Sequence, residues 1–209
     1  MATQSETMAR IVDGALKLAA ECGWRRVRLA DIAHAAGLQP VELYRCAGSK
    51  AAILAAFSAR IDEAMLADPD PELAGESVRD RLFALLMRRF DALRPYRDAV
   101  RALAGRGVLD PFELGCGALH LSRSMGWALD AAGVGAGGLL GCLRVKGLAA
   151  IYLLTVRVWL EDESEDMAKT MLALDRRLGR ADALIATLCR GRTRTESAGE
   201  EEAAPAPAG

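Results

Sequence analysis

The sequence predicts an all-α protein, and three observations lead to that class. More than half of the 209 residues are apolar, and most of this apolar content is Ala and Leu, which favour helices. Val, Ile and Thr are sparse, and few stretches alternate apolar and polar residues with a period of two. Apolar residues instead recur at spacings of three and four, so each recognisable segment is expected to be an amphipathic helix.

The first helix is expected over residues 8–22, where apolar residues fall on one face. Ser5 or Thr7 can cap its start, and Gly23 can end it. A short second helix is expected over residues 29–36. An acidic residue in its first turn suits the positive end of the helix dipole.

A tight corner at Gly37 separates the second helix from a third, because Gly supplies the positive φ that such a corner requires. Pro40 sits where the first residue of a helix tolerates a missing N–H, and the third helix is expected to run to about Arg45. Ser49 can cap a longer fourth helix. The apolar stripe of that helix consists of Ile53, Leu54, Phe57, Ile61 and Met65.

The remaining sequence is expected to form a second, larger helical domain. The Asp-Pro-Asp-Pro stretch at 68–71 indicates a linker or sharp corner. Residues 1–60 are therefore expected to form one domain and residues 61–190 another, while residues 191–209, rich in Glu, Ala, Pro and Gly, form a disordered tail. The helices expected in the second domain are one capped by Ser77 and ending before Pro95, one over 96–103, one over 111–132, one from Leu139 to Leu160 and one from Met167 to Leu188.

The last two of these helices are expected to join two copies of the chain. The helix from Leu139 to Leu160 is apolar nearly all round, so we expect it to lie between other helices. The helix from Met167 to Leu188 repeats apolar residues at spacings of four and three, which is a seam for packing at a shallow angle. A four-helix interface in a homodimer would use both. The alternative is that the last helix packs within its own chain.

Charge and cysteine usage narrow the functional classes. The net charge is −1, yet the first 60 residues hold eight Lys or Arg against five Asp or Glu, which suits a protein that touches phosphate at one end. Five scattered cysteines without a C-x-x-C pair indicate reduced thiols in the cytoplasm. No signal peptide is expected, and no membrane span either, because three charges interrupt the longest apolar stretch. These charges are Arg144, Lys146 and Arg157.

The two short helices around Gly37 predict a helix-turn-helix, which projects its second helix into the major groove of DNA. The reading helix would begin at Pro40. Base edges are within the chemical reach of Gln39, Val41 and Glu42. Side chains suited to phosphate are Arg28, Tyr44, Arg45 and Lys50.

This region resembles the DNA-binding domain of the tetracycline-repressor family. The elements that carry the resemblance are Asp31-Ile32-Ala33, Ala36-Gly37-Leu38, Leu43-Tyr44 and Gly48-Ser49-Lys50 with Ile53-Leu54. The resemblance implies that Tyr44 and Lys50 anchor phosphates, and that residues 39–45 read DNA. It further implies an all-helical homodimer that releases DNA when a small molecule enters the second domain. Three positions depart from the family pattern, namely Gln39 at the cap of the reading helix, Ala47 in place of an aromatic residue, and Arg28 in place of Thr.

A second resemblance concerns the C-terminal half of the chain. It rests on Leu93-Arg94-Pro95-Tyr96, on Trp159 with Asp162, Ser164 and Asp166, and on Leu174-Asp175-Arg176-Arg177-Leu178. These pieces are similar to the lipid-binding accessory proteins of ubiquinone biosynthesis, which are built on the tetracycline-repressor fold. The resemblance implies presentation of isoprenoid quinone precursors to a hydroxylase.

Large apolar side chains in the second domain are candidates for an effector pocket, although ordinary core packing is the alternative at such helical spacing. The candidates are Met87, Phe90, His120, Met125, Trp127 and Trp159. The two histidines are far apart in the sequence, so no metal site is predicted. The G-x-G-x-x-G at 133–138 follows no strand, as a dinucleotide site would require, so an interhelical loop is expected there. No catalytic set and no cofactor are predicted.

The hypothesis is a cytoplasmic, homodimeric, sequence-specific repressor that a small hydrophobic effector releases from double-stranded DNA. The alternative is a lipid-binding accessory protein of ubiquinone biosynthesis on the same fold. An enzyme is the third class considered, and no residue set supports it.

Overall fold

The computed structural model describes residues 3–67, 73, 75–105 and 111–183. Within these ranges the chain forms helices and no strand, so the predicted all-α class is confirmed. The helices are α1 (Gln4–Cys22), α2 (Leu29–Ala35), α3 (Pro40–Cys46), α4 (Lys50–Leu66), α5 (Val78–Leu93), α6 (Arg97–Ala104), α7 (Pro111–Ala131) and α8 (Gly138–Glu161), with short 3-10 turns η1 (Trp24–Arg26) and η3 (Arg94–Tyr96). A further helix covers residues 168–183.

The first helix begins earlier than expected. Thr3, rather than Ser5 or Thr7, caps α1: its hydroxyl accepts from the Glu6 amide, and the Glu6 carboxylate accepts from the Thr3 amide. This reciprocal pair satisfies two amides that the helix itself leaves unbonded. The C-terminal end is as predicted, with Gly23 at φ +82°.

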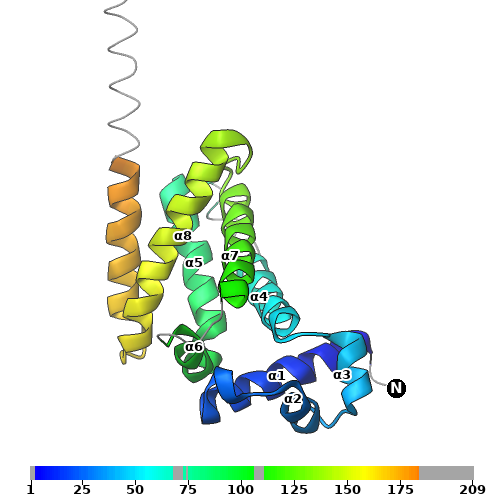
Figure 1. Ribbon diagram of the computed structural model, residues 1–209. Coiled ribbons are helices and arrows are strands. Elements are labelled where there is room, and N and C mark those ends of the chain that lie inside the picture. The colour runs from blue at the N-terminus through cyan, green and yellow to red at the C-terminus, as the bar shows by residue number, and fades with distance from the viewer. Residues whose placement is uncertain (1–2, 68–72, 74, 106–110, 184–209) are drawn as a thin grey trace, which may run out of the picture.

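The helices α1, α2 and α3 pack as a compact head (Figure 1). Gly37 has φ +64°, as expected for the corner between α2 and α3. The absence of a side chain at Gly14 lets α1 approach α2 closely, because a Cβ there would lie 3.3 Å from the Cβ of Ala35. The buried centre of the head is made by Ile11, Ala15, Trp24, Ile32 and Leu43.

The long helix α4 leaves the head and enters the body of the molecule (Figure 1). It starts as predicted, with the Ser49 hydroxyl accepting from the Ala52 amide at 3.1 Å. The helix continues without interruption past residue 60, so the predicted boundary between the two domains falls inside α4 and not in a loop. The predicted linker at 68–71 and the tail at 191–209 lie outside the described residues.

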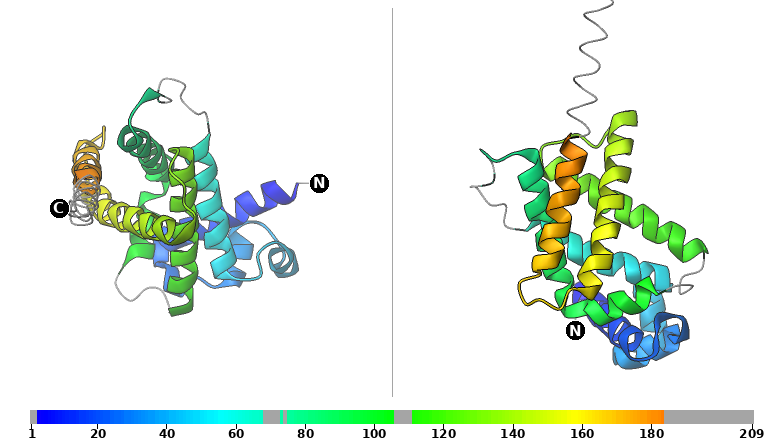
Figure 2. Two further views of the ribbon diagram at one scale, coloured as in Figure 1. Left: turned by 90° about the horizontal axis from the view of Figure 1, so that it is seen from above. Right: turned by 90° about the vertical axis from the view of Figure 1, so that its left-hand side faces the viewer.

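The body comprises α5 to α8 and the helix over 168–183 (Figure 2). Ser77 caps α5 as predicted, and α5 ends just before the turn that contains Pro95. Helix α6 lies against α1 of the head, and α7 packs against α4 and α8. Fully buried side chains of this core include Leu86, Phe90, Met125, Trp159 and Leu174.

The helix α8 was expected to lie between other helices and to take part in an interface between two copies. Within one chain one of its faces is open: Leu139 is 94% exposed, and Leu140, Leu143, Leu153 and Leu154 are also exposed. The opposite face is buried at Leu148, Tyr152, Thr155 and Trp159. Although the sequence predicted no membrane span, α8 is long and apolar enough to cross a membrane by length and composition alone.

Candidate DNA-binding surface and effector cavity

The candidate recognition helix α3 packs against the head with one face and exposes the other face to solvent. Leu43 is buried in the head, while Val41 is 53% and Tyr44 74% exposed. Gln39, Pro40, Glu42 and Arg45 are exposed as well. The structure thus brings the predicted reading residues together on the outer surface of one short helix.

The cap of α3 explains how Gln39 is tolerated at its start. The carboxylate of Glu42 accepts from the Gln39 backbone amide at 2.7 Å. This is the Glu half of a capping box, and it fixes the first turn without a Ser or Thr side chain. The carboxylate of Glu42 is therefore engaged with its own backbone, while Val41 and Tyr44 are exposed on the outer face of the helix.

Arg28, predicted to meet phosphate, forms a two-pronged ion pair with Asp31. Its Nε and Nη2 donate to the two carboxylate oxygens at 3.0 and 2.9 Å, and its backbone amide also donates to Asp31. The hydrogen bonds raise the pKa of Arg28 and lower the pKa of Asp31. Arg28 therefore closes the start of α2 while its side chain remains on the surface.

Lys50, the second predicted phosphate anchor, is held against the head. Its Nζ donates to the Trp24 carbonyl at 2.8 Å and lies 4.4 Å from the centroid of the Trp24 ring. Trp24 is completely buried, and Ala47 is buried beside the same core. Lys50 thus ties the start of α4 to η1, and one of its three N–H donors is already used.

Arg10 supports this surface from α1, and no pattern within the neighbouring residues predicted its role. From α1 its Nη2 donates to the carbonyl of Ala36 and, at 3.2 Å, to that of Gly37. These carbonyls belong to the corner between α2 and α3, which is 26 and 27 residues away in sequence. Arg10 therefore fixes the angle at which α3 leaves the corner.

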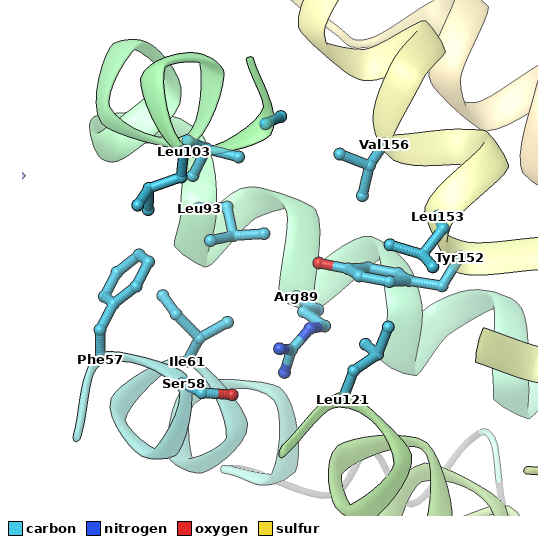
Figure 3. Close-up of a pocket in the computed structure, with 12 residues that line it drawn as sticks. Phe57, Ser58, Ile61, Arg89, Leu93, Leu103, Leu121, Tyr152, Leu153 and Val156 are labelled. Carbon is cyan, nitrogen blue, oxygen red and sulfur yellow. The ribbon is translucent and has the colours of Figure 1, made fainter. Parts of the chain in front are cut away.

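A cavity of about 280 Å³ lies in the body between α4, α5, α6, α7 and α8 (Figure 3). Its walls are mainly apolar, which is typical of small-molecule sites. The residues that line it are Phe57, Ser58, Ile61, Arg89, Leu93, Val100, Leu103, Ala104, Leu121, Tyr152, Leu153 and Val156.

One corner of the cavity is polar. The buried guanidinium of Arg89 is ion-paired with the Asp62 carboxylate, whose Oδ2 accepts from the Ser124 hydroxyl at 2.6 Å. The Tyr152 ring faces the same guanidinium, 5.3 Å from Cζ to the ring centroid. Burial lowers the pKa of Arg89, but the neighbouring Tyr152 and Asp62 outweigh it and the net shift is upward. Arg89 is therefore a fixed positive charge.

None of the six residues predicted to form the pocket lines this cavity. Phe90, Met125 and Trp159 are fully buried between helices, Met87 is buried, and Trp127 is 52% exposed. Periodic apolar residues on helices fill the core first, which is why they do not border empty space. Phe90 lies behind the cavity wall, where its ring stacks on the ring of Tyr152 with the two centroids 5.3 Å apart. His120 is half-buried on α7 and is absent from the lining.

A cluster of arginines joins the two sequence regions that carry the second resemblance. Arg94, Arg97 and Arg101 donate to the carbonyls of Glu165, Asp162 and Leu160 at 2.7, 2.7 and 2.8 Å. Cations at these carbonyls stabilise the C-terminal end of α8. The segments around residues 94–101 and 160–165 therefore form one junction.

The carboxylate of Asp162 organises the far side of this junction. It is fully buried and accepts from the amide and hydroxyl of both Ser164 and Thr170. Burial alone would raise its pKa, but these hydrogen bonds outweigh burial and hold the pKa of Asp162 well below its usual range. The arrangement anchors the helix over 168–183 to the end of α8. In the described part of the chain, no cluster of His, Cys, Asp or Glu has the composition of a metal site.

Comparisons with known proteins agree with both resemblances. The family of bacterial regulatory proteins called tetR matches residues 11–57, and the COQ9 family matches residues 146–185. The structure is similar to a TetR transcriptional regulator from Nitrosomonas europaea ATCC 19718, with 28% identity and a TM-score of 0.68 over 84% of this chain and 97% of that one. A TetR transcriptional regulator from Rhodococcus sp. RHA1 shares the fold, with 21% identity and a TM-score of 0.53 over 82% and 94% of the two chains. No curated protein matches the sequence.

Proposed function

We propose that this chain, which carries a tetR-type N-terminal domain on the fold of TetR regulators, is a homodimeric repressor that a small hydrophobic molecule releases from its operator. The observation that carries the proposal is the exposed outer face of α3, with Val41 and Tyr44 open beside Gln39 and Arg45. A helix of this kind fits the major groove, where Gln can pair with adenine while Tyr and Arg contact phosphate.

The position of the cavity supports control by a ligand. Phe57, Ser58 and Ile61 of α4 form part of its wall, and the same helix starts directly behind α3. On its other side, Arg60 of α4 contacts α1 in the head. A molecule that binds the cavity unequally in two positions of α4 would therefore shift the head between two orientations.

The open face of α8 supports a dimer. The helix over 168–183 runs alongside part of α8 (Figures 1 and 2), and its Leu172 is also exposed. Exposed apolar side chains on neighbouring helices are typical of subunit interfaces. Two copies related by a two-fold axis would present two α3 helices to half-sites about 34–36 Å apart.

The proposal is tested by fluorescence anisotropy with the DNA upstream of the protein's own coding region and a scrambled duplex, each at two salt concentrations. We expect selective binding that weakens with salt. The Tyr44→Ala and Arg45→Ala variants are expected to lose affinity, whereas Arg123→Ala, which removes an exposed arginine from α7, keeps it. If the upstream DNA is not selected, selection from a random-sequence library follows. A folded dimer that enriches no site there contradicts the proposal.

A second candidate function is lipid binding in ubiquinone biosynthesis, favoured by the COQ9 match over α8 and the next helix. A cavity of about 280 Å³ is small for an isoprenoid chain, and an exposed reading helix has no purpose in a lipid carrier. Native mass spectrometry discriminates between the two: an isoprenoid lipid that copurifies with a protein without DNA affinity supports the second candidate.

A further inference from the structure

The cavity in the body has an uneven distribution of polar groups. Figure 3 shows the Tyr152 hydroxyl directed into the space that Phe57, Ile61 and Leu93 border, with the Arg89 guanidinium beneath it. Ser58 supplies another hydroxyl on the same side. An apolar space with a few convergent polar groups is the usual form of a small-molecule site, and the polar groups set which molecules it accepts.

The charge at this corner is already balanced. Among the described residues that line the cavity, Arg89 is the charged one. Its partner Asp62 lies directly behind it on α4, with one carboxylate oxygen on the guanidinium and the other on the Ser124 hydroxyl. Arg89 and Asp62 together carry no net charge, so the site contains no surplus cation for an anionic ligand.

This balance discriminates between classes of ligand. A carboxylate placed against Arg89 would add a second negative charge beside the Asp62 carboxylate, and like charges that share one site repel each other. A cationic ligand would face the guanidinium itself. An uncharged molecule meets neither penalty and can fill the apolar walls.

Tyr152 is the group best placed to orient such a molecule. Its ring is held between Phe90, stacked at 5.3 Å, and the Arg89 guanidinium, 5.3 Å from the ring centroid. These two contacts hold the ring in place, so the direction of its hydroxyl is fixed and a phenol O–H can donate to a ligand. A carbonyl oxygen is the matching acceptor.

We propose that the cavity selects a compact, uncharged, mainly apolar molecule with a carbonyl oxygen that accepts from the Tyr152 hydroxyl, and that Asp62 excludes organic anions of the same shape. This proposal rests on the proposed function in one respect, which is that the cavity is the effector site. Since Asp62 belongs to α4, the residue that rejects anions also lies on the helix that leads to the head.

The test is isothermal titration calorimetry at pH 7.5 with two probes of matched shape, 2-acetylnaphthalene and 2-naphthoate. We expect the ketone to bind at least about tenfold more tightly than the carboxylate, because the carboxylate meets the like charge of Asp62. Tyr152→Phe should weaken the ketone about tenfold. Leu119→Ala, which changes an exposed leucine outside the lining, should alter neither Kd.

The Asp62→Asn variant tests the role of the Asp62 charge directly. Removal of the carboxylate charge leaves Arg89 as a surplus cation, so the variant should bind 2-naphthoate at least about tenfold more tightly than the wild type does. The Kd of the ketone should change little. Circular dichroism establishes that the variant is folded; if it is not, the wild-type comparison and Tyr152→Phe still decide. Tighter binding of the carboxylate by the wild type, or binding of neither probe, overturns the proposal. Because no DNA is present, failure of the proposed DNA binding leaves this result intact, and selective DNA binding without probe discrimination overturns this inference alone.

Discussion

The guanidinium of Arg60 on α4 donates to the carboxylate of Asp13 on α1 at 2.5 Å. The same guanidinium donates to the Ala9 carbonyl at 3.1 Å and to the Tyr96 hydroxyl at 3.2 Å. Tyr96 in turn meets Phe57, a cavity residue, edge to face at 5.2 Å. One side chain therefore joins the head, the connecting helix and the wall of the cavity.

Arg60→Met is expected to destabilise the protein more than Asp13→Asn. Asp13 is mostly exposed, and an exposed ion pair contributes about 0–1 kcal/mol. Removal of Arg60 also leaves the Ala9 carbonyl and Tyr96 hydroxyl without their donor, so a loss of about 1–2 kcal/mol is expected. Urea denaturation of both variants measures the difference. Equal losses would mean that the contacts to Ala9 and Tyr96 contribute nothing.

Tyr44→Ala and Lys50→Ala are expected to separate DNA contact from stability. Tyr44 is 74% exposed, so its removal should change the free energy of unfolding by less than about 0.5 kcal/mol while reducing DNA affinity and its salt dependence. Lys50→Ala also removes the bond to the Trp24 carbonyl and the contact with the Trp24 ring, at a cost of about 1–2 kcal/mol. Anisotropy and thermal denaturation of the same samples test this. A stable Lys50→Ala variant would refute the structural role of Lys50.

Local signals in the sequence were enough to predict most of the head. Ser49 as a cap, Gly37 as a corner and Gly23 as an end each act within a few residues of their own position, and the structure contains all three. Thr3 was missed because Ser5 and Thr7 offered equally good chemistry, and only the reach of Glu6 decides between them.

The cavity could not be predicted in the same way. Three helices bring together Asp62, Arg89 and Tyr152. The ion pair between Asp62 and Arg89 joins residues 27 apart in sequence, and no short-range pattern predicts such a pair. Helical periodicity identifies side chains that face the core, such as Phe90 and Trp159, but it does not distinguish those that fill the core from those that border a space. The sequence of α8 shows a related limit: an apolar helix has the same sequence whether its own chain or a second copy covers it, so which of its faces is open had to come from the structure.

Asp162→Asn is expected to lower stability at neutral pH and to flatten its dependence on acid. The folded-state pKa of Asp162 lies below the unfolded value, so its contribution is present above about pH 4 and is lost as the pH falls through the folded pKa. Asparagine cannot accept from all four donors of Ser164 and Thr170, and a loss of about 1–3 kcal/mol is expected at pH 7. Denaturant titrations between pH 7 and the acid limit measure both effects. An unchanged acid slope in the variant would show that Asp162 does not titrate below its usual range.

Charge introduced on the open face of α8 is expected to separate the proposed dimer. Leu140 and Leu143 are more than half exposed and lie one turn apart, so Leu140→Glu with Leu143→Glu places four carboxylates in a two-fold interface. Sedimentation velocity should then give the monomer where the wild type gives the dimer. Leu119→Glu is the matched control, because that leucine is similarly exposed but belongs to α7. If the double variant remains dimeric, the interface lies on another surface. Operator binding by the monomeric variant then shows whether two α3 helices are required together.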